Sequence, residues 1–279
     1  MNTHIQKEKA TQFRGFHQGP PLLVLPNAWD AASARIIEQA GFRAIATTSS
    51  GVAAALGYSD GQHMSRELMI DALARITHVV ECPVTVDIEA GYGNSIDEVL
   101  QTVKAVFMTG AVGINIEDSL KQQEKALVDI AYQVELIKAL RELARSMDVP
   151  FVINARVDVF LLAIGEPESR FEQTVQRAHA YLHAGADCIY PIGILDRTMI
   201  ANLVKAINGP INILGGPPGP PLPELAQLGV ARVSLAGSLM RSVLGHLRAI
   251  AQELFESGTY TKMNAEALSG QEFRSLFTM

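Results

Sequence analysis

The chain has 279 residues, of which 48% are hydrophobic and 19% are charged, and its formal net charge is −6. This composition is typical of a folded globular protein and excludes extended disorder. The acidic balance, with no basic stripe that carries interleaved aromatic residues, argues against nucleic acid as a partner. No apolar run approaches the roughly 18 residues that a membrane span needs, so we expect no membrane partner.

The first fourteen residues form a polar leader without the apolar core and small-residue cleavage site of a secretory signal. The two cysteines, Cys82 and Cys188, have no CxxC spacing and no neighbouring histidine cluster. They are interpreted as small buried apolar side chains in a reducing compartment. The sequence therefore predicts a cytoplasmic protein.

Short apolar runs alternate with helical patterns along the chain, which is typical of a parallel α/β fold. Eight strands are predicted, at residues 22–25, 44–47, 84–87, 113–116, 151–155, 188–190, 211–214 and 232–235. Eight strands, each followed by a helix, predict closure into a single (β/α)8 barrel of the TIM type. We assign residues 1–257 to this barrel with its leader, and residues 258–279 to a C-terminal helical tail.

The most informative stretch is the third strand and its loop, Val84-Thr-Val-Asp-Ile-Glu-Ala-Gly-Tyr-Gly93. If the strand alternation continues through it, Asp87 and Glu89 point to one face while Val86 and Ile88 point to the other. Paired acids at a strand end, followed by a glycine loop, suit a divalent cation held directly and through water. The alternative is an acidic turn that only caps the next helix.

Polar residues also end the neighbouring strands, where a barrel places its chemistry. By the same alternation, Asn115 with Glu117 and Asn154 with Arg156 face the barrel interior. These groups form either a structural ion network or a site for a cation and an anionic substrate, which the planar fork of Arg156 would bind. Two further candidates for substrate contact are Tyr190, which ends strand six, and Asn212 on strand seven. The alternative for Tyr190 is a core aromatic residue.

Several motifs then occur in a characteristic order: Pro26-Asn-Ala-Trp-Asp30, Ser49-Ser-Gly-Val52, Gly57-Tyr-Ser-Asp60, Asp87-Ile-Glu-Ala-Gly-Tyr-Gly-Asn94, Gly113-Ile-Asn-Ile-Glu-Asp118 and Ile153-Asn-Ala-Arg-Val-Asp158. Together they resemble the isocitrate lyase and phosphoenolpyruvate mutase superfamily over nearly the whole barrel. The resemblance implies a Mg2+-dependent enzyme, with Mn2+ as the alternative ion, that acts on a 2-oxo or 2-hydroxy acid through an enolate-like species.

The resemblance also implies roles for individual residues. Asp87 would bind the metal directly, while Glu89 and Glu117 would hold its water ligands. The backbone of Ser50, Gly51 and Val52 would bind the substrate carboxylate. The implied catalytic residues are Arg156, Glu117 and Asp60. Arg156 would bind a substrate oxygen, and Asp60 would hold the metal-bound waters without contacting the metal.

The superfamily often exchanges its last barrel helix between subunits. The apolar run at residues 235–254 fits such an exchange in a homodimer or homotetramer. An ordinary eighth helix packed on its own barrel is the alternative.

One departure bears on the substrate. Lyases for isocitrate and methylisocitrate carry a Lys-Lys-Cys-Gly-His lid after strand four, whereas residues 119–127 contain neither Cys nor His. The run from Lys121 to Lys125 would position a phosphoryl group only loosely. We therefore predict a carbon–carbon lyase or decarboxylase for a small 2-oxo or 2-hydroxy dicarboxylic acid. The alternatives are phosphorus–carbon chemistry, as in phosphoenolpyruvate mutases and phosphonopyruvate hydrolases, and a catalytically silent barrel that binds oxo-acids.

Overall fold

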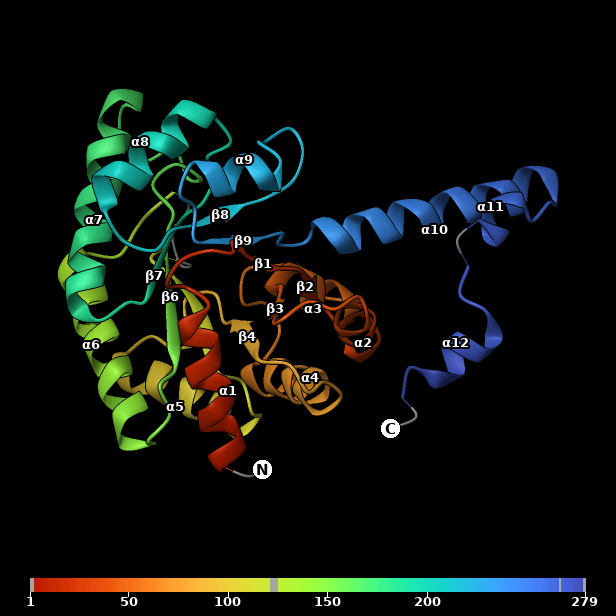
Figure 1. Ribbon diagram of the computed structural model, residues 1–279, viewed down its shortest axis with the longest axis horizontal. Coiled ribbons are helices and arrows are strands. Elements are labelled where there is room, and N and C mark those ends of the chain that lie inside the picture. Colours follow the sequence, from red (N-terminus) through yellow and green to blue (C-terminus); the bar gives the residue numbers. More distant parts are fainter. Residues whose placement is uncertain (1–2, 121–124, 266, 278–279) are drawn as a thin grey trace.

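The computed structural model describes residues 3–120, 125–265 and 267–277. Its centre is a barrel of parallel strands surrounded by helices (Figure 1). The strands are β1 (Leu23–Leu25), β2 (Asn27–Ala28), β3 (Ile45–Thr47), β4 (Val84–Asp87), β5 (Gly113–Glu117), β6 (Val152–Val157), β7 (Cys188–Pro191), β8 (Asn212–Leu214) and β9 (Arg232–Ser234). The longer helices around them are α2 (Ala31–Gln39), α4 (Arg66–His78), α5 (Ile96–Met108), α6 (Ile130–Ser146), α7 (Arg170–Ala184) and α8 (Arg197–Ile207).

The hydrogen-bonded strands fall into two groups that together complete the barrel. One has the order β1-β9-β8 and the other the order β2-β3-β4-β5-β6-β7. A parallel bridge between Ile189 and Ile211 joins β7 to β8, and only Pro26 separates β1 from β2. The predicted barrel and its eight strands are therefore confirmed. The first strand is divided because proline has no N–H to donate to the ladder.

The polar leader is a helix, α1 (Thr3–Gly15), and not merely a solvated segment. Gln6, Ala10 and Phe13 are its buried residues, and their spacing places them on one helical face. Gln6 donates from Nε2 to the carbonyl oxygens of Phe107 and Ala111, each at 2.9 Å. Both acceptors lie just before β5, so α1 covers the end of the barrel where the strands begin.

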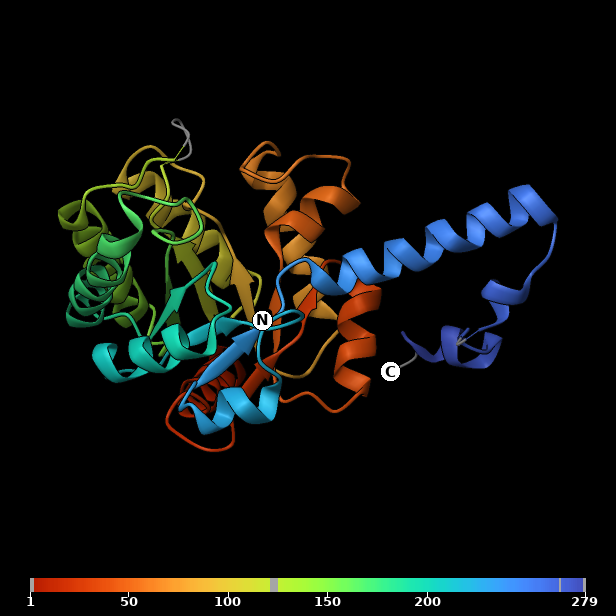
Figure 2. The same cartoon turned by 90° about the horizontal axis from the view of Figure 1, so that it is seen from above.

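The helix that follows β9 does not pack along the barrel. This helix, α10 (Ser238–Ser257), projects away from it and leads into α11 (Thr261–Asn264) and α12 (Gly270–Ser275) (Figures 1 and 2). All residues of α10 are described, and Met240 alone among them is buried. After α12 the chain returns towards α2, where Arg35 donates to the carbonyl oxygen of Leu276 at 2.7 Å. The predicted C-terminal helical extension is thus present.

The described helices do not include one with the length and apolar character needed to cross a membrane.

Candidate active site

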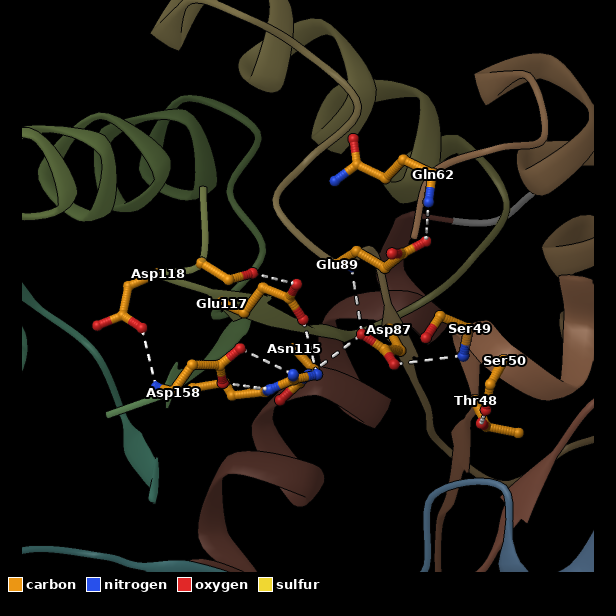
Figure 3. A network of polar contacts seen from close by, with 12 residues as sticks. Thr48, Ser49, Ser50, Gln62, Asp87, Glu89, Asn115, Glu117, Asp118 and Asp158 are labelled. Atoms are coloured by element: carbon orange, nitrogen blue, oxygen red, sulfur yellow. Dashed lines mark hydrogen bonds and ion pairs between the residues drawn. The ribbon is translucent and has the colours of Figure 1, made fainter. Parts of the chain in front are cut away.

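Asp87 ends β4 at the mouth of the barrel, and several donors orient its carboxylate (Figure 3). Oδ2 accepts from the backbone N–H of Ser49 at 3.2 Å. Oδ1 accepts from Nδ2 of Asn115 at 3.1 Å and from the N–H of Glu89 at 3.2 Å. The backbone N–H of Asp87 itself donates to the Thr47 hydroxyl at 3.0 Å. Groups from β3, α3 (Ser49–Ala55) and β5 therefore converge on one carboxylate.

Glu89 reaches this region by a different route from the one the strand alternation predicts. The strand ends at Asp87, and Glu89 has a φ of 52° in the left-handed region. Its side chain is buried, and Oε1 accepts from the N–H of Gln62 at 3.0 Å and from the hydroxyl of Tyr92 at 3.2 Å. The prediction that period two sets its direction was wrong, because that period applies only to extended backbone.

Arg156 forms the charged centre of the site. It lies opposite Glu117 in the parallel register of β5 and β6, and its Nη1 is 2.6 Å from Oε2 of Glu117. Its Nε and Nη2 donate to the two oxygens of Asp158 at 2.6 and 2.8 Å. Burial lowers the pKa of Arg156, but the negative charges of Glu117 and Asp158 raise it by more. The pKa of Arg156 is therefore well above its usual value. The predicted inward face of β6 is confirmed.

Asp158 is itself held by a further carboxylate, Asp118. Oδ1 of Asp118 accepts from the backbone N–H of Asp158 at 2.9 Å, and its Oδ2 accepts from Arg177 and Tyr181 at 3.1 and 2.7 Å. Burial raises the pKa of Asp118 above its ordinary value, against the opposing charge of Arg177. This packing anchors the backbone at the end of β6.

A cavity of about 40 Å³ lies among these groups, inside the barrel. Asp87, Asn115, Arg156, Tyr190 and Arg232 supply its functional side chains. This volume holds roughly one or two water molecules. Beside Glu117 a wider hollow of about 540 Å³ opens between the loops after β4 and β5 and the start of α6.

The other predicted contact residues of strands six and seven differ in their placement. Tyr190 lines the cavity, and burial raises the pKa of its phenol to about 12. Asn212 is fully buried and donates from Nδ2 to the Ser234 hydroxyl at 3.0 Å. Ser234 lines the cavity, so this hydrogen bond connects Asn212 to the site.

The predicted backbone donors Ser50, Gly51 and Val52 belong to the first part of α3, beside Asp87. The N–H of Val52 already donates to the carbonyl oxygen of Thr48 at 2.9 Å, so it is engaged within the helix. Glycine is required at position 51, because a Cβ there would lie 2.6 Å from Cγ2 of Thr48 and 2.9 Å from Cβ of Trp29. The close approach of these segments keeps α3 against the site.

Asp60, the remaining predicted catalytic residue, is exposed in the loop between α3 and α4. Its charge acts on Tyr92, whose pKa is raised by burial first, then by Glu89, with smaller contributions from Asp87 and Asp60. Asp60 therefore influences the rim of the site, and its catalytic role stays a prediction.

Arg232 is the residue that sequence reasoning missed. It is 2% exposed and lines the same cavity, and burial lowers the pKa of its guanidinium. The available signal was an arginine beside Val233 at the start of a barrel strand, where branched apolar side chains are usual. The support that Asp158 gives to Arg156 was likewise not predicted.

The carboxylates at the site suit a hard cation. Among the described residues, no three His, Cys, Asp or Glu side chains converge closely enough to bind one ion directly. Mg2+ requires less than that, because it keeps several waters and takes one or two carboxylates. The oriented carboxylate of Asp87, with Glu89 and Glu117 near it, fits one direct oxygen ligand and two acceptors for metal-bound water.

Comparisons with known proteins identify similar sequences. The family model described as phosphoenolpyruvate phosphomutase matches residues 13–255. An uncharacterised protein of Mycobacterium tuberculosis is 39% identical over 218 residues, which cover 78% of each chain.

Two solved structures extend the likeness to the fold. A Burkholderia cenocepacia protein provisionally named a lyase or mutase is 35% identical, with a TM-score of 0.91, and the match covers 99% of this chain and 98% of the other. A 2,3-dimethylmalate lyase of the PEP mutase/isocitrate lyase superfamily is 25% identical, with a TM-score of 0.84 over 96% of this chain and 92% of its own.

Proposed function

The chain belongs to the phosphoenolpyruvate phosphomutase family, and from this membership and the site geometry we propose a Mg2+-dependent carbon–carbon lyase or decarboxylase. Its substrate is a small 2-oxo or 2-hydroxy dicarboxylic acid, cleaved to an enolate-like product. One observation carries the proposal: Arg156, held by Glu117 and Asp158, lines the same cavity as the oriented carboxylate of Asp87.

In this proposal some residues bind the metal ion and its waters, and others orient the substrate. Asp87 would bind Mg2+, with Glu89 and Glu117 holding its waters, and the ion would supply Lewis-acid polarisation of a substrate oxygen. Arg156 donates to the substrate oxygen on which negative charge develops, and its two carboxylate partners prevent it from rotating away. Such preorganised donors cost no reorganisation during the reaction. Tyr190 lines the same cavity.

The loop after β5 supports cleavage of a simple acid. The sequence between residues 119 and 127 offers neither Cys nor His to protonate a carbanion. Residues 121–124, which include most of the run considered for phosphoryl binding, lie outside the described residues. Decarboxylation or retro-aldol cleavage of a small acid requires no such group, because solvent can deliver the proton. Oxaloacetate and alkylmalates are the substrates of choice, and the similarity to a 2,3-dimethylmalate lyase favours the second.

A turnover screen tests the proposal, with oxaloacetate, alkylmalates, isocitrate, methylisocitrate and phosphonopyruvate offered with Mg2+, with Mn2+ and with EDTA. We expect metal-dependent release of a pyruvate-like or smaller oxo-acid from oxaloacetate or an alkylmalate, and none from the Asp87→Ala protein. Faster turnover of isocitrate or methylisocitrate would refute it. Turnover of phosphonopyruvate alone would establish phosphorus–carbon chemistry, and binding without turnover would establish a silent barrel.

We also propose that the protein is a homo-oligomer in which two copies exchange α10. The helix projects from the barrel (Figure 2) and exposes Val243, Leu244, Leu247 and Phe255, the last at 93%. An apolar helix face of this kind is stabilised when a second surface covers it. The neighbouring barrel of a second copy would provide that surface, as a dimer or as a tetramer of two such pairs.

A further inference from the structure

Arg232 occupies an unusual position for a charged residue. It is the first residue of β9, opposite Leu23 of β1 and Asn212 of β8 in the parallel register. Its side chain is 2% exposed and lines the cavity inside the barrel. Taking a guanidinium out of water is unfavourable unless hydrogen bonds and an opposite charge replace the lost hydration.

Those replacements are incomplete for Arg232. Within the described part of the chain, its Nε and Nη1 have no hydrogen-bond partner. Arg141, which is also buried, shows what a satisfied guanidinium looks like here, since it donates to the carbonyl oxygens of Gly185 and Phe151 and to Asp187. Arg232 therefore holds unused donors at a place where they are costly.

The charged residues around the cavity leave Arg232 without a counter-ion of its own among the described residues. Arg156 is matched by Glu117 and Asp158. Among the described residues, Asp87 is the carboxylate whose charge acts on Arg232, and Asp87 is assigned to the metal. Among the residues that the structure describes, the charge of Arg232 thus has no dedicated counter-ion.

The hydroxyl of Tyr190 lies in the same cavity. This hydroxyl is buried and has no hydrogen-bond partner among the described residues. Its polar neighbour is the side chain of Ser234. Arg232 and Arg156 both act electrostatically on this phenol. Arg232 and Tyr190 line the same cavity, whose volume of about 40 Å³ suits a single carboxylate group. A hydroxyl donor and a guanidinium match the oxygens of such a group.

We propose that Arg232, together with Tyr190, binds the second carboxylate of a small dicarboxylate whose 2-oxo or 2-hydroxy end is held by Arg156 and Asp87. This inference rests on the proposed function and deepens it, because it makes Arg232 the residue that selects dicarboxylates over monocarboxylates. A monocarboxylate would leave the buried guanidinium without its anion. The selection follows because an unpaired buried charge is unfavourable.

Calorimetric titration with (S)-malate and (S)-lactate in the presence of Mg2+ tests it, since these acids differ only in the terminal carboxylate. The wild-type protein is expected to bind malate about 10- to 100-fold more tightly, as for a charge-assisted pair. Arg232→Met is expected to lose this preference while its affinity for lactate is unchanged. Arg75→Met, which removes an equal charge from an exposed position on α4, is the matched control and keeps the preference.

Two milder variants keep the test decisive if Arg232→Met does not fold. Arg232→Lys retains the charge without the fork, and Tyr190→Phe removes one hydroxyl. Each is expected to lower the affinity for malate several-fold and to leave lactate unchanged. Wild-type preference for malate in these variants would overturn the inference.

The remaining outcomes separate this inference from the proposed function. If both acids bind the wild-type protein equally, the role of Arg232 is refuted and the proposed function stands. If neither binds, the turnover screen decides on the proposed function, and formate decides on Arg232 alone. A formate-dependent rise in the melting midpoint of wild type that Arg232→Met and Arg232→Lys lack would support an anion position, and an equal rise in all three would overturn it.

Discussion

Arg156 lies on β6 and Asp158 is the first residue after that strand, and the two side chains form a two-point ion pair, with Nε–Oδ1 and Nη2–Oδ2 distances of 2.6 and 2.8 Å. The carboxylate that follows the end of the strand thus holds the guanidinium of Arg156 at two points. The remaining amino group, Nη1, contacts Glu117 on the neighbouring strand. The guanidinium orientation is therefore set before any substrate arrives.

This arrangement predicts that Arg156→Lys is not a conservative change. Lysine keeps the charge but cannot make the two-point contact with Asp158 while also contacting Glu117. We expect a loss of at least about 100-fold in kcat/KM on the substrate found in the screen, about 2.7 kcal/mol of transition-state stabilisation. Full kcat/KM in the lysine variant would show that Arg156 does not clamp the substrate. Asp158→Asn should lower kcat/KM to a smaller extent, because it loosens the orientation and keeps the arginine.

Metal affinity should depend on Asp87 far more than on a comparable buried acid nearby. Asp87→Ala is expected to abolish measurable Mg2+ or Mn2+ binding in calorimetry, since it removes the direct carboxylate ligand. Asp118→Asn provides the control, because Asp118 bonds to Arg177, Tyr181 and the backbone of Asp158. The asparagine variant should be less stable and should still bind the ion. Unchanged affinity in Asp87→Ala would exclude Asp87 as the ligand.

Acid stability should depend on His17. Burial first, then the nearby charge of Arg232, lowers the pKa of this histidine from 6.5 to about 3. The unfolded chain therefore binds a proton below about pH 6.5 that the folded chain does not bind until about pH 3, so folding stability falls as pH falls through this window. We expect His17 to account for about 2 kcal/mol of the loss between pH 7 and pH 5.

Urea unfolding at these two pH values, with His17→Gln as the comparison, measures this contribution. Other groups also titrate in the window, so the quantity of interest is the difference between the two proteins. The glutamine variant should lose less stability on acidification than wild type. An equal loss in both proteins would mean that His17 is not held neutral in the fold.

Two buried arginines should respond oppositely to the same substitution. Arg141→Met removes the donors to two carbonyl oxygens and to Asp187, and breaking such a buried pair costs about 3–5 kcal/mol. Arg232→Met removes Nε and Nη1, which have no hydrogen-bond partner among the described residues, so we expect the ligand-free variant to be at least as stable as wild type. The urea midpoints of the two variants provide the comparison. A large destabilisation by Arg232→Met would indicate a structural role for Arg232.

The association of subunits should depend on the exposed apolar face of α10. Replacing Leu244 and Leu247, which are 46% and 56% exposed, by glutamate should yield a monomer in size-exclusion chromatography with light scattering. Arg248→Glu, a charge change at an exposed position of the same helix, is the matched control and should remain an oligomer. A wild-type protein that elutes as a monomer would contradict the proposed exchange.

Much of the barrel can be predicted from the sequence because the alternation of side chains along a strand is a local property. The alternation within residues 113–117 and 152–157 places Asn115, Glu117, Asn154 and Arg156 on the inward face, and the structure confirms this. The order of polar strand ends likewise indicates which rim carries the chemistry. These inferences require only backbone geometry between near neighbours in the chain.

The tertiary structure decided what depends on distant partners. Glu89 leaves the strand alternation because its side chain meets Gln62 and Tyr92 in a loop. The polar leader becomes α1 because Gln6 finds carbonyl oxygens more than a hundred residues away. The unpartnered donors of Arg232 can be recognised only in the folded barrel. Whether a buried donor has a hydrogen-bond partner depends on its three-dimensional surroundings and not on residue type.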